Sequence, residues 1–175
     1  MKKKCKNIAL TGMMGCGKST VAKEIKSILA DYTWIEMDAY LEKKECKSIN
    51  EIFSTYGEDY FRKIEAQYIE SLADDFKQII SMGGGAYLNE DNRKNFSKNS
   101  FSVYLKASAD TIYERIKDDN SRPLLKAKDI KAKIKELLEI REKMYELADC
   151  TVITDNKSVN EIALEILEKY KKHGN

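Results

Sequence analysis

The chain has 175 residues, of which 42% are hydrophobic and 34% charged, and its formal net charge is +2. This length suits one well-buried domain, and the nearly balanced charge gives no reason to expect nucleic acid as a partner. The longest apolar segments are strand-sized, which argues against a membrane span, while four scattered cysteines with one histidine argue against a zinc site and favour the cytoplasm.

Short runs of β-branched and aromatic residues alternate with helical patterns along the whole chain. Strands are predicted, in chain order, at residues 7–11, 33–37, 78–82, 101–106 and 151–154. Helices are predicted from about 18 to 31, from 48 to 57, on to about 74, and at 109–118, 130–148 and 158–171. Capping boxes at Ser48 with Glu51 and at Ser158 with Glu161 mark two helix starts. This alternation indicates a parallel sheet covered on both faces, in one three-layer α/β domain.

The first predicted strand is followed by a glycine-rich loop, Gly12-Met-Met-Gly-Cys-Gly-Lys-Ser19, which matches G-x-x-x-x-G-K-[ST] at every fixed position. Glycines let backbone N–H groups turn toward a phosphate, and the next helix adds its positive N-terminal end. Lys18 supplies a cation for the β- and γ-phosphates, and the Ser19 hydroxyl suits magnesium. The motif predicts a nucleoside triphosphate site. Near the fifth strand, Asn156-Lys-Ser-Val159 lacks the aspartate that reads guanine, which favours ATP over GTP.

Two acids, Glu36 and Asp38, stand at the end of the second predicted strand. Ligands gather at the carboxyl ends of strands in such sheets, and alternate strand residues point the same way. We expect one carboxylate to hold magnesium through water and the other to accept a proton from an attacking hydroxyl. The alternative interpretation is that Asp38 caps the following helix.

Two arginines occupy unusual places on predicted helices. In the helix at 130–148, Arg141 falls near the centre of the apolar stripe, while Arg62 borders an inner helix face that contains Glu65. A buried guanidinium needs an anion, and two arginines for one internal glutamate leave positive charge over. Beside a phosphate loop, we interpret them as a clamp for an external carboxylate, supported by Glu65. A structural ion cluster is the alternative.

Gly83, Gly84 and Gly85 end the third predicted strand, and three residues without side chains are typical of a backbone that a ligand approaches closely. Arg122 lies between two predicted helices, beside the only proline of the chain. A flap that carries Arg122 to the phosphates would exclude water and neutralise charge in the transition state. A plain interhelical loop is the alternative.

Together these segments resemble the shikimate kinase family, over nearly the whole chain from Ile8 to Leu167. The resemblance rests on GMMGCGKST, the acids around Met37, SINEIFSTYGEDYFRKIE, MGGGA, SRPLL and REKMY. It implies a P-loop NTPase fold of the nucleoside-monophosphate-kinase type with a five-stranded parallel sheet. A single domain would span residues 1–175, with a flap at about 119–128 and acceptor-binding helices at about 38–74.

The resemblance also implies a reaction and roles for individual residues. ATP would phosphorylate the 3-hydroxyl of shikimate, in aromatic amino acid biosynthesis, with one Mg²⁺ ion per subunit and a monomeric enzyme. Catalytic roles would fall to Lys18, Asp38 and Arg122, and the metal to Ser19 and Glu36. ATP would contact Gly15, Cys16, Gly17, Lys18, Ser19, Thr20, Arg115, Arg122 and Lys157. Shikimate would contact Asp38, Arg62, Gly84 and Arg141, with Glu65, Gly83 and Gly85 beside them.

The chain departs from the usual family pattern at two of these positions. Glu36 stands where the family usually has aspartate, and Lys157 where arginine is more common. Two other functions are weighed against the first. Another small P-loop kinase would act on gluconate or a nucleoside monophosphate, although the glycines and the internal glutamate fit a compact polyol acid better. A nucleotide-binding module without turnover is the second, and only the Glu36 departure favours it.

Overall fold

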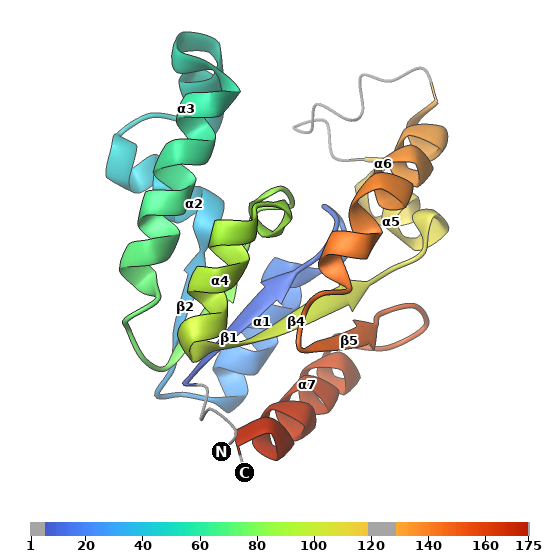
Figure 1. Cartoon of the computed structure of the whole chain (residues 1–175). Coiled ribbons are helices and arrows are strands. Elements are labelled where there is room, and N and C mark those ends of the chain that lie inside the picture. Colours follow the sequence, from blue (N-terminus) through green and yellow to red (C-terminus); the bar gives the residue numbers. More distant parts are fainter. Residues whose placement is uncertain (1–5, 119–128, 175) are drawn as a thin grey trace.

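The computed structural model describes residues 6–118 and 129–174, and its five strands form one parallel sheet (Figure 1). The strands are β1 (Asn7–Thr11), β2 (Thr33–Glu36), β3 (Gln78–Ser81), β4 (Ser100–Lys106) and β5 (Cys150–Ile153). Their order across the sheet is β2-β3-β1-β4-β5, and every neighbouring pair is parallel. The predicted five-stranded parallel sheet is confirmed.

The sheet is buried on both faces at its centre. Ile8, Ala9 and Leu10 of β1 are all fully buried, as are Ile79 and Ile80 of β3. Continuous apolar runs of this kind are what a parallel sheet between two helical layers requires. The register places Ile8 beside Ile79, so the two strands end at the same edge of the sheet.

Helices make up the two outer layers. They are α1 (Lys18–Ile28), α2 (Met37–Glu45), α3 (Ile49–Leu72), α4 (Glu90–Asn99), α5 (Ala109–Ile116), α6 (Ile130–Tyr145) and α7 (Val159–Gly174), with a 3-10 helix, η1 (Ala86–Leu88). The helices α1 and α7 pack together on one face of the sheet, and α4 covers the other (Figure 1). In Figure 1, α3 rises on one side of the sheet, and α5 and α6 rise on the other. The three-layer α/β/α arrangement is confirmed.

Both predicted capping boxes are present at the starts of long helices. The Ser48 backbone N–H donates to Glu51 Oε2 at 2.7 Å, and the Glu51 N–H donates to Ser48 Oγ at 3.2 Å. Ser158 and Glu161 repeat this reciprocal pattern before α7. The predicted break near residue 57 lies inside α3, where Gly57 has φ 82° and ψ 173°. The helix pattern therefore continues past a kink at that glycine.

The helix α4 was not among the predicted elements. Its residues are almost all polar, and only Asn92 and Phe96 are buried, so its hydrophobic periodicity is weak. The helix start is fixed locally, because the Asn89 side chain accepts hydrogen bonds from the backbone N–H groups of Asp91 and Asn92. Among residues 6–118 and 129–174, none of the helices combines the length and apolar character needed to cross a membrane.

Candidate active site

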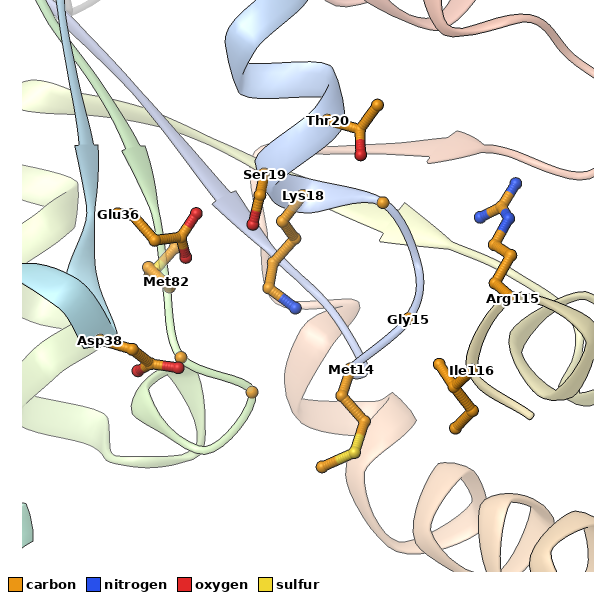
Figure 2. Close-up of a pocket in the computed structure, with 13 residues that line it drawn as sticks. Met14, Gly15, Lys18, Ser19, Thr20, Glu36, Asp38, Met82, Arg115 and Ile116 are labelled. Carbon is orange, nitrogen blue, oxygen red and sulfur yellow. The ribbon is translucent and has the colours of Figure 1, made fainter. Parts of the chain in front are cut away.

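A cavity of about 560 Å³ lies at the carboxyl edge of β1, β2 and β3 (Figure 2). The loop between β1 and α1 forms one wall, the ends of β2 and β3 form another, and Arg115 and Ile116 of α5 form a third. Figure 2 shows Lys18 reaching toward the middle, between Glu36 and Asp38 on one side and Arg115 on the other. The strand order thus brings together the phosphate loop, the two acids and the glycine segment predicted from the sequence.

The phosphate loop depends on its glycines for its shape. Gly15 has φ 79°, and a Cβ there would come within 2.6 Å of Ile116 Cγ2. Gly17 has φ 105° and occupies the N-cap of α1, where no side chain caps the helix. The first N–H groups of α1 therefore keep no side-chain partner at the cap and suit a phosphate.

The Lys18 side chain is hydrogen-bonded to the backbone of the phosphate loop. Its Nζ donates to the carbonyl oxygens of Gly12 at 2.8 Å and Met13 at 3.1 Å. These bonds fold the side chain back over the loop and hold the ammonium at the cavity. A cation at that place attracts phosphate oxygens held by the loop N–H groups.

Glu36 and Asp38 both line the cavity, but not for the predicted reason. The strand β2 ends at Glu36 and Met37 already belongs to α2, so the two acids do not alternate along one strand. Met37 starts the helix with its side chain fully buried in the core. The N-cap of α2 is Glu36, which makes no side-chain cap bond, so the interpretation of Asp38 as the N-cap is wrong.

The Glu36 carboxylate has features that suit a divalent cation. Burial raises its pKa and the charge of Asp38 adds to this, while the Ser19 hydroxyl and the charge of Lys18 lower it. Its Oε2 is buried and, among the described residues, has no hydrogen-bond partner. An oxygen of this kind beside the Ser19 hydroxyl fits Mg²⁺, which prefers oxygen ligands. No group of three or more His, Cys, Asp or Glu side chains at metal-binding spacing occurs in the described part of the chain.

The glycine segment is shaped by the side chains around it. A Cβ on Gly83 would lie 2.9 Å from Asp38 Oδ1 and 3.3 Å from Glu65 Oε1, and a Cβ on Gly85 would lie 2.6 Å from Arg62 Nη2. Gly84 differs, because a Cβ there would meet only ordinary contacts of 3.7 Å or more. Close approach to protein side chains thus explains two of the three glycines, and only Gly83 and Gly84 line the cavity.

Arg62 and Glu65 form the predicted pair on α3. Arg62 Nη1 donates to Glu65 Oε2 at 2.8 Å, and Nη2 contacts Glu58 Oε1 at 3.2 Å. Glu65 is 1% exposed, so burial raises its pKa, although the charge of Arg62 lowers it. The Oε1 atom of Glu65 is buried and lacks a partner within the described residues. Part of the Arg62 charge is therefore balanced internally, as the ion-cluster interpretation supposed.

Arg141 lies half-buried on α6, without an ion pair to any carboxylate in residues 6–118 or 129–174. Its guanidinium interacts with the hydroxyl of Tyr145, where its charge and its hydrogen bond lower a pKa that burial raises. Tyr145 in turn donates to the Gly84 carbonyl at 2.6 Å. Arg141 and Arg62 do not line the cavity themselves but stand beside the glycine segment that does. In the sequence, nothing distinguishes Tyr145 from the apolar residues of the same helix.

Arg115 and Lys157 meet at a second, smaller cavity of about 120 Å³ beside the phosphate loop, which Cys16 also lines. Arg115 Nη1 donates to the Cys16 carbonyl at 2.9 Å and to Thr154 Oγ1 at 3.3 Å. Lys157 pairs with Glu165 at 2.6 Å. Arg115 and Lys157, both predicted to contact ATP, are thus brought together. Thr154, which no sequence motif singles out, holds Arg115 in place. Arg122 and the predicted flap at 119–128 lie outside the described residues.

Comparison with known proteins decides which kind of P-loop protein this is. A family model described as shikimate kinase matches residues 14–171. The chain belongs to the shikimate kinase family. The shikimate kinase of Caldanaerobacter subterraneus subsp. tengcongensis is 39% identical over 95% of this chain and 97% of its own.

Solved structures agree with this family. The shikimate kinase of Acinetobacter baumannii, solved in complex with shikimate, has a TM-score of 0.88 and 30% identity, over 96% of this chain and 94% of that one. A gluconokinase from Sinorhizobium meliloti has a TM-score of 0.65 and 19% identity, over 97% of this chain and 94% of that one, and shares the fold alone. The predicted P-loop kinase fold is confirmed, and the chain is an enzyme that uses ATP. Among the functions weighed above, shikimate kinase is the one that the comparisons favour.

Proposed function

We propose that this chain transfers the γ-phosphoryl group of ATP to the 3-hydroxyl of shikimate, releasing ADP and 3-phosphoshikimate. Its family membership carries this proposal. One cavity joins the phosphate loop to Asp38 and to the glycine segment, so a nucleotide and a small acceptor can meet there. The bound shikimate of the Acinetobacter baumannii relative supports the same acceptor here.

The donor side of the site is the phosphate loop and the start of α1. We propose that the backbone from Gly15 to Thr20 holds the β-phosphate, because helix N-termini and glycine turns direct N–H groups toward anions. Lys18 exchanges its loop carbonyls for phosphate oxygens when ATP binds. Arg115 and Lys157 flank the base at the smaller cavity, where Cys16 forms part of the wall.

The acceptor side lies between α2, α3, α6 and the glycine segment. Asp38 orients the 3-hydroxyl and accepts its proton as the oxygen attacks phosphorus. Arg62 and Arg141 hold the shikimate carboxylate, which supplies the anion that Arg141 lacks among the described carboxylates. Glu65 keeps Arg62 in place through the 2.8 Å bond. Gly83, Gly84 and Gly85 leave the room that the acceptor and these side chains need.

Transfer of the phosphoryl group depends on charge stabilisation more than on covalent chemistry. Lys18 neutralises charge that moves toward the leaving oxygen of ADP. Arg122, in the segment at 119–128, does the same from the flap that the family resemblance implies. Closure of a flap over the cavity would exclude water and so prevent transfer of the phosphoryl group to water in place of shikimate.

We propose that Ser19 and Glu36 hold one Mg²⁺ ion, Ser19 through its hydroxyl and Glu36 through the buried Oε2 or through water. The ion, when bound, supplies positive charge to the β- and γ-phosphate oxygens. Glutamate has a longer side chain than the aspartate usual in the family, so its reach toward the ion differs. Ser19 and Glu36 already lie side by side, and a hydrogen bond from the Ser19 hydroxyl lowers the pKa of Glu36.

The remaining assignments concern the setting of the enzyme. We propose a monomeric cytoplasmic protein, a single domain over residues 1–175 without nucleic acid or membrane partners. Cys16, Cys46 and Cys150 are free, which suits a reducing compartment. We propose that α2 and α3 are the acceptor-binding helices expected at 38–74, because Asp38 and Glu65 lie against Gly83 and Arg62 lies against Gly85.

A coupled assay of ADP release, with and without shikimate, tests the proposed function. We expect ADP release from ATP that depends on shikimate and does not occur with gluconate or AMP. Activity with gluconate or AMP would indicate a different small P-loop kinase. Tight ATP binding without ADP release on addition of shikimate would indicate a nucleotide-binding module.

A further inference from the structure

Tyr145 ends α6 in a fully buried position next to the glycine segment. Its ring packs against Tyr104, with ring centroids 5.3 Å apart. Its hydroxyl donates a 2.6 Å hydrogen bond to the carbonyl oxygen of Gly84, a residue 61 positions earlier. This bond joins α6 to the segment that follows β3. The carbonyl belongs to Gly84, which lines the cavity.

The same hydroxyl also faces Arg141. The two residues are four apart on α6, so their side chains lie on one face of the helix. The guanidinium of Arg141 interacts with the Tyr145 oxygen, and the charge of Arg62 also reaches it. A tyrosine hydroxyl has one proton to donate, and Gly84 takes it. The Tyr145 oxygen can then only accept a hydrogen bond from a neighbour. The Arg141 guanidinium, which carries donors alone, suits that role.

We propose that Tyr145 is a positioning residue for the acceptor carboxylate, since its hydroxyl fixes the Arg141 guanidinium and joins it to Gly84. This inference rests on the proposed function of Arg141. Bidentate recognition of a carboxylate requires the planar guanidinium to be held in one orientation. A side chain that is already oriented has fewer rotamers to lose when the ligand binds, so affinity rises without a further contact.

A purely structural role for Tyr145 predicts different behaviour. A buried hydroxyl that only satisfies the Gly84 carbonyl would, if removed, lower stability without favouring one substrate over the other. A positioning role predicts a loss specific to the acceptor and to its carboxylate. The two roles are therefore separable by kinetics.

The test is Tyr145→Phe, which removes one oxygen and keeps the ring. Tyr104→Phe is the matched control, because its ring is also buried in the same aromatic pair, while its hydroxyl contacts Glu142 at 3.4 Å. We expect Tyr145→Phe to raise the KM and the calorimetric Kd for shikimate about tenfold, with the KM for ATP unchanged. Tyr104→Phe should change the shikimate constants less than about threefold. Equal effects of both variants, or a normal shikimate KM in Tyr145→Phe, would overturn the proposal.

The methyl ester of shikimate provides a second arm, because it keeps the 3-hydroxyl and lacks the negative charge. Wild-type enzyme should use the ester poorly, and Tyr145→Phe should use it as well as wild type does. A tenfold loss that persists with the ester means that Tyr145 acts on something other than the carboxylate clamp. Wild-type enzyme inactive toward shikimate would refute the proposed function itself, whereas active wild type with an unaffected variant refutes only the role of Tyr145.

A measurement on wild-type protein keeps the inference testable should the variant fold poorly. In protein labelled with ¹⁵N-arginine, the Arg141 Nε–H resonance is assigned by its loss in Arg141→Lys. A guanidinium held by Tyr145 should give a distinct, slowly exchanging resonance before shikimate is added. An averaged, rapidly exchanging resonance that sharpens only with shikimate would contradict prior positioning.

Discussion

The guanidinium of Arg62 lies against the α-carbon of Gly85, so closely that a methyl group built there would come 2.6 Å from Nη2 and 2.8 Å from Nη1. The same guanidinium donates to Glu65 at 2.8 Å. Its position is therefore set by a carboxylate on one side and by the absence of a side chain on the other. The backbone of Gly85 has φ −98°, which alanine adopts without strain.

Gly85→Ala should displace Arg62 without unfolding the protein, because the methyl group meets the end of a flexible side chain. We expect the KM for shikimate to rise about tenfold while the melting temperature shifts by about 2 °C or less. Steady-state kinetics and differential scanning fluorimetry measure the two effects. In an Arg62→Ala background the same change should have no further effect on the KM, and an additive loss there would contradict the steric explanation.

Gly84→Ala probes the neighbouring position, where the protein itself leaves room. A Cβ would lie 3.7 Å from the Met14 nitrogen and 3.8 Å from the Gly12 carbonyl oxygen, both ordinary contacts. We expect the melting temperature to be unchanged or slightly higher, since replacing glycine restricts the unfolded chain by about 0.4–1 kcal/mol. Activity with shikimate should fall at least about tenfold, because the methyl group occupies the cavity wall. Full activity of the Gly84→Ala enzyme would mean that the acceptor does not bind beside Gly84.

Arg141→Ala should remove the second half of the carboxylate clamp. We expect the free energy of shikimate binding to weaken by about 2–5 kcal/mol, with the KM for ATP unchanged. Lys135→Ala is a control on the exposed face of α6 and should behave as wild type. Shikimate binding that is untouched by the loss of Arg141 would refute the clamp.

Glu36→Gln should separate stability from metal binding. Burial raises the pKa of Glu36 in the folded protein above its value in the unfolded chain. Such a carboxyl favours folding only while it is protonated, and that contribution is lost as the pH rises through the folded-state pKa. At neutral pH without metal, the neutral glutamine should therefore raise the melting temperature by about 2 °C, equivalent to less than about 1 kcal/mol. This advantage should shrink as the pH is lowered and Glu36 becomes protonated.

The same Glu36→Gln protein should bind Mg²⁺ more weakly. We expect the stabilisation of the protein by ADP to require about tenfold more Mg²⁺ than in wild type, measured as the shift in melting temperature. Glu70→Gln, on the exposed surface of α3, is the matched control and should change neither quantity. An unchanged Mg²⁺ requirement in Glu36→Gln would exclude Glu36 from the metal site.

Features that depend on neighbouring residues could be predicted from the sequence. The phosphate loop is one, because the strand, the glycines and the helix N-terminus follow one another along the chain. The pairing of Arg62 with Glu65 is another, since a spacing of three residues on a helix brings the side chains together. The alternation of strands and helices along the chain likewise predicted the three-layer α/β/α arrangement.

Features that depend on distant partners could not be predicted. Nothing near Tyr145 in the sequence indicates that its hydroxyl reaches Gly84, and a buried tyrosine in an apolar stripe looks like any core residue. The crowding of Gly85 by Arg62 likewise involves two separate elements. The boundary at Met37 was misjudged by one residue because a buried methionine suits the end of a strand and the start of a helix equally well.

The position of β3 between β1 and β2 has a consequence for the order of events during synthesis. A nascent chain that has emerged only as far as Leu72 contains Lys18, Glu36 and Asp38, yet its two strands share no ladder, because each pairs with β3 and not with the other. Gln78–Ser81 must insert between them before the lysine and the acids can face one another. The phosphate loop and the two acids are therefore brought together by a segment that carries little chemistry of its own, and Arg115, Arg141 and Lys157 emerge later still.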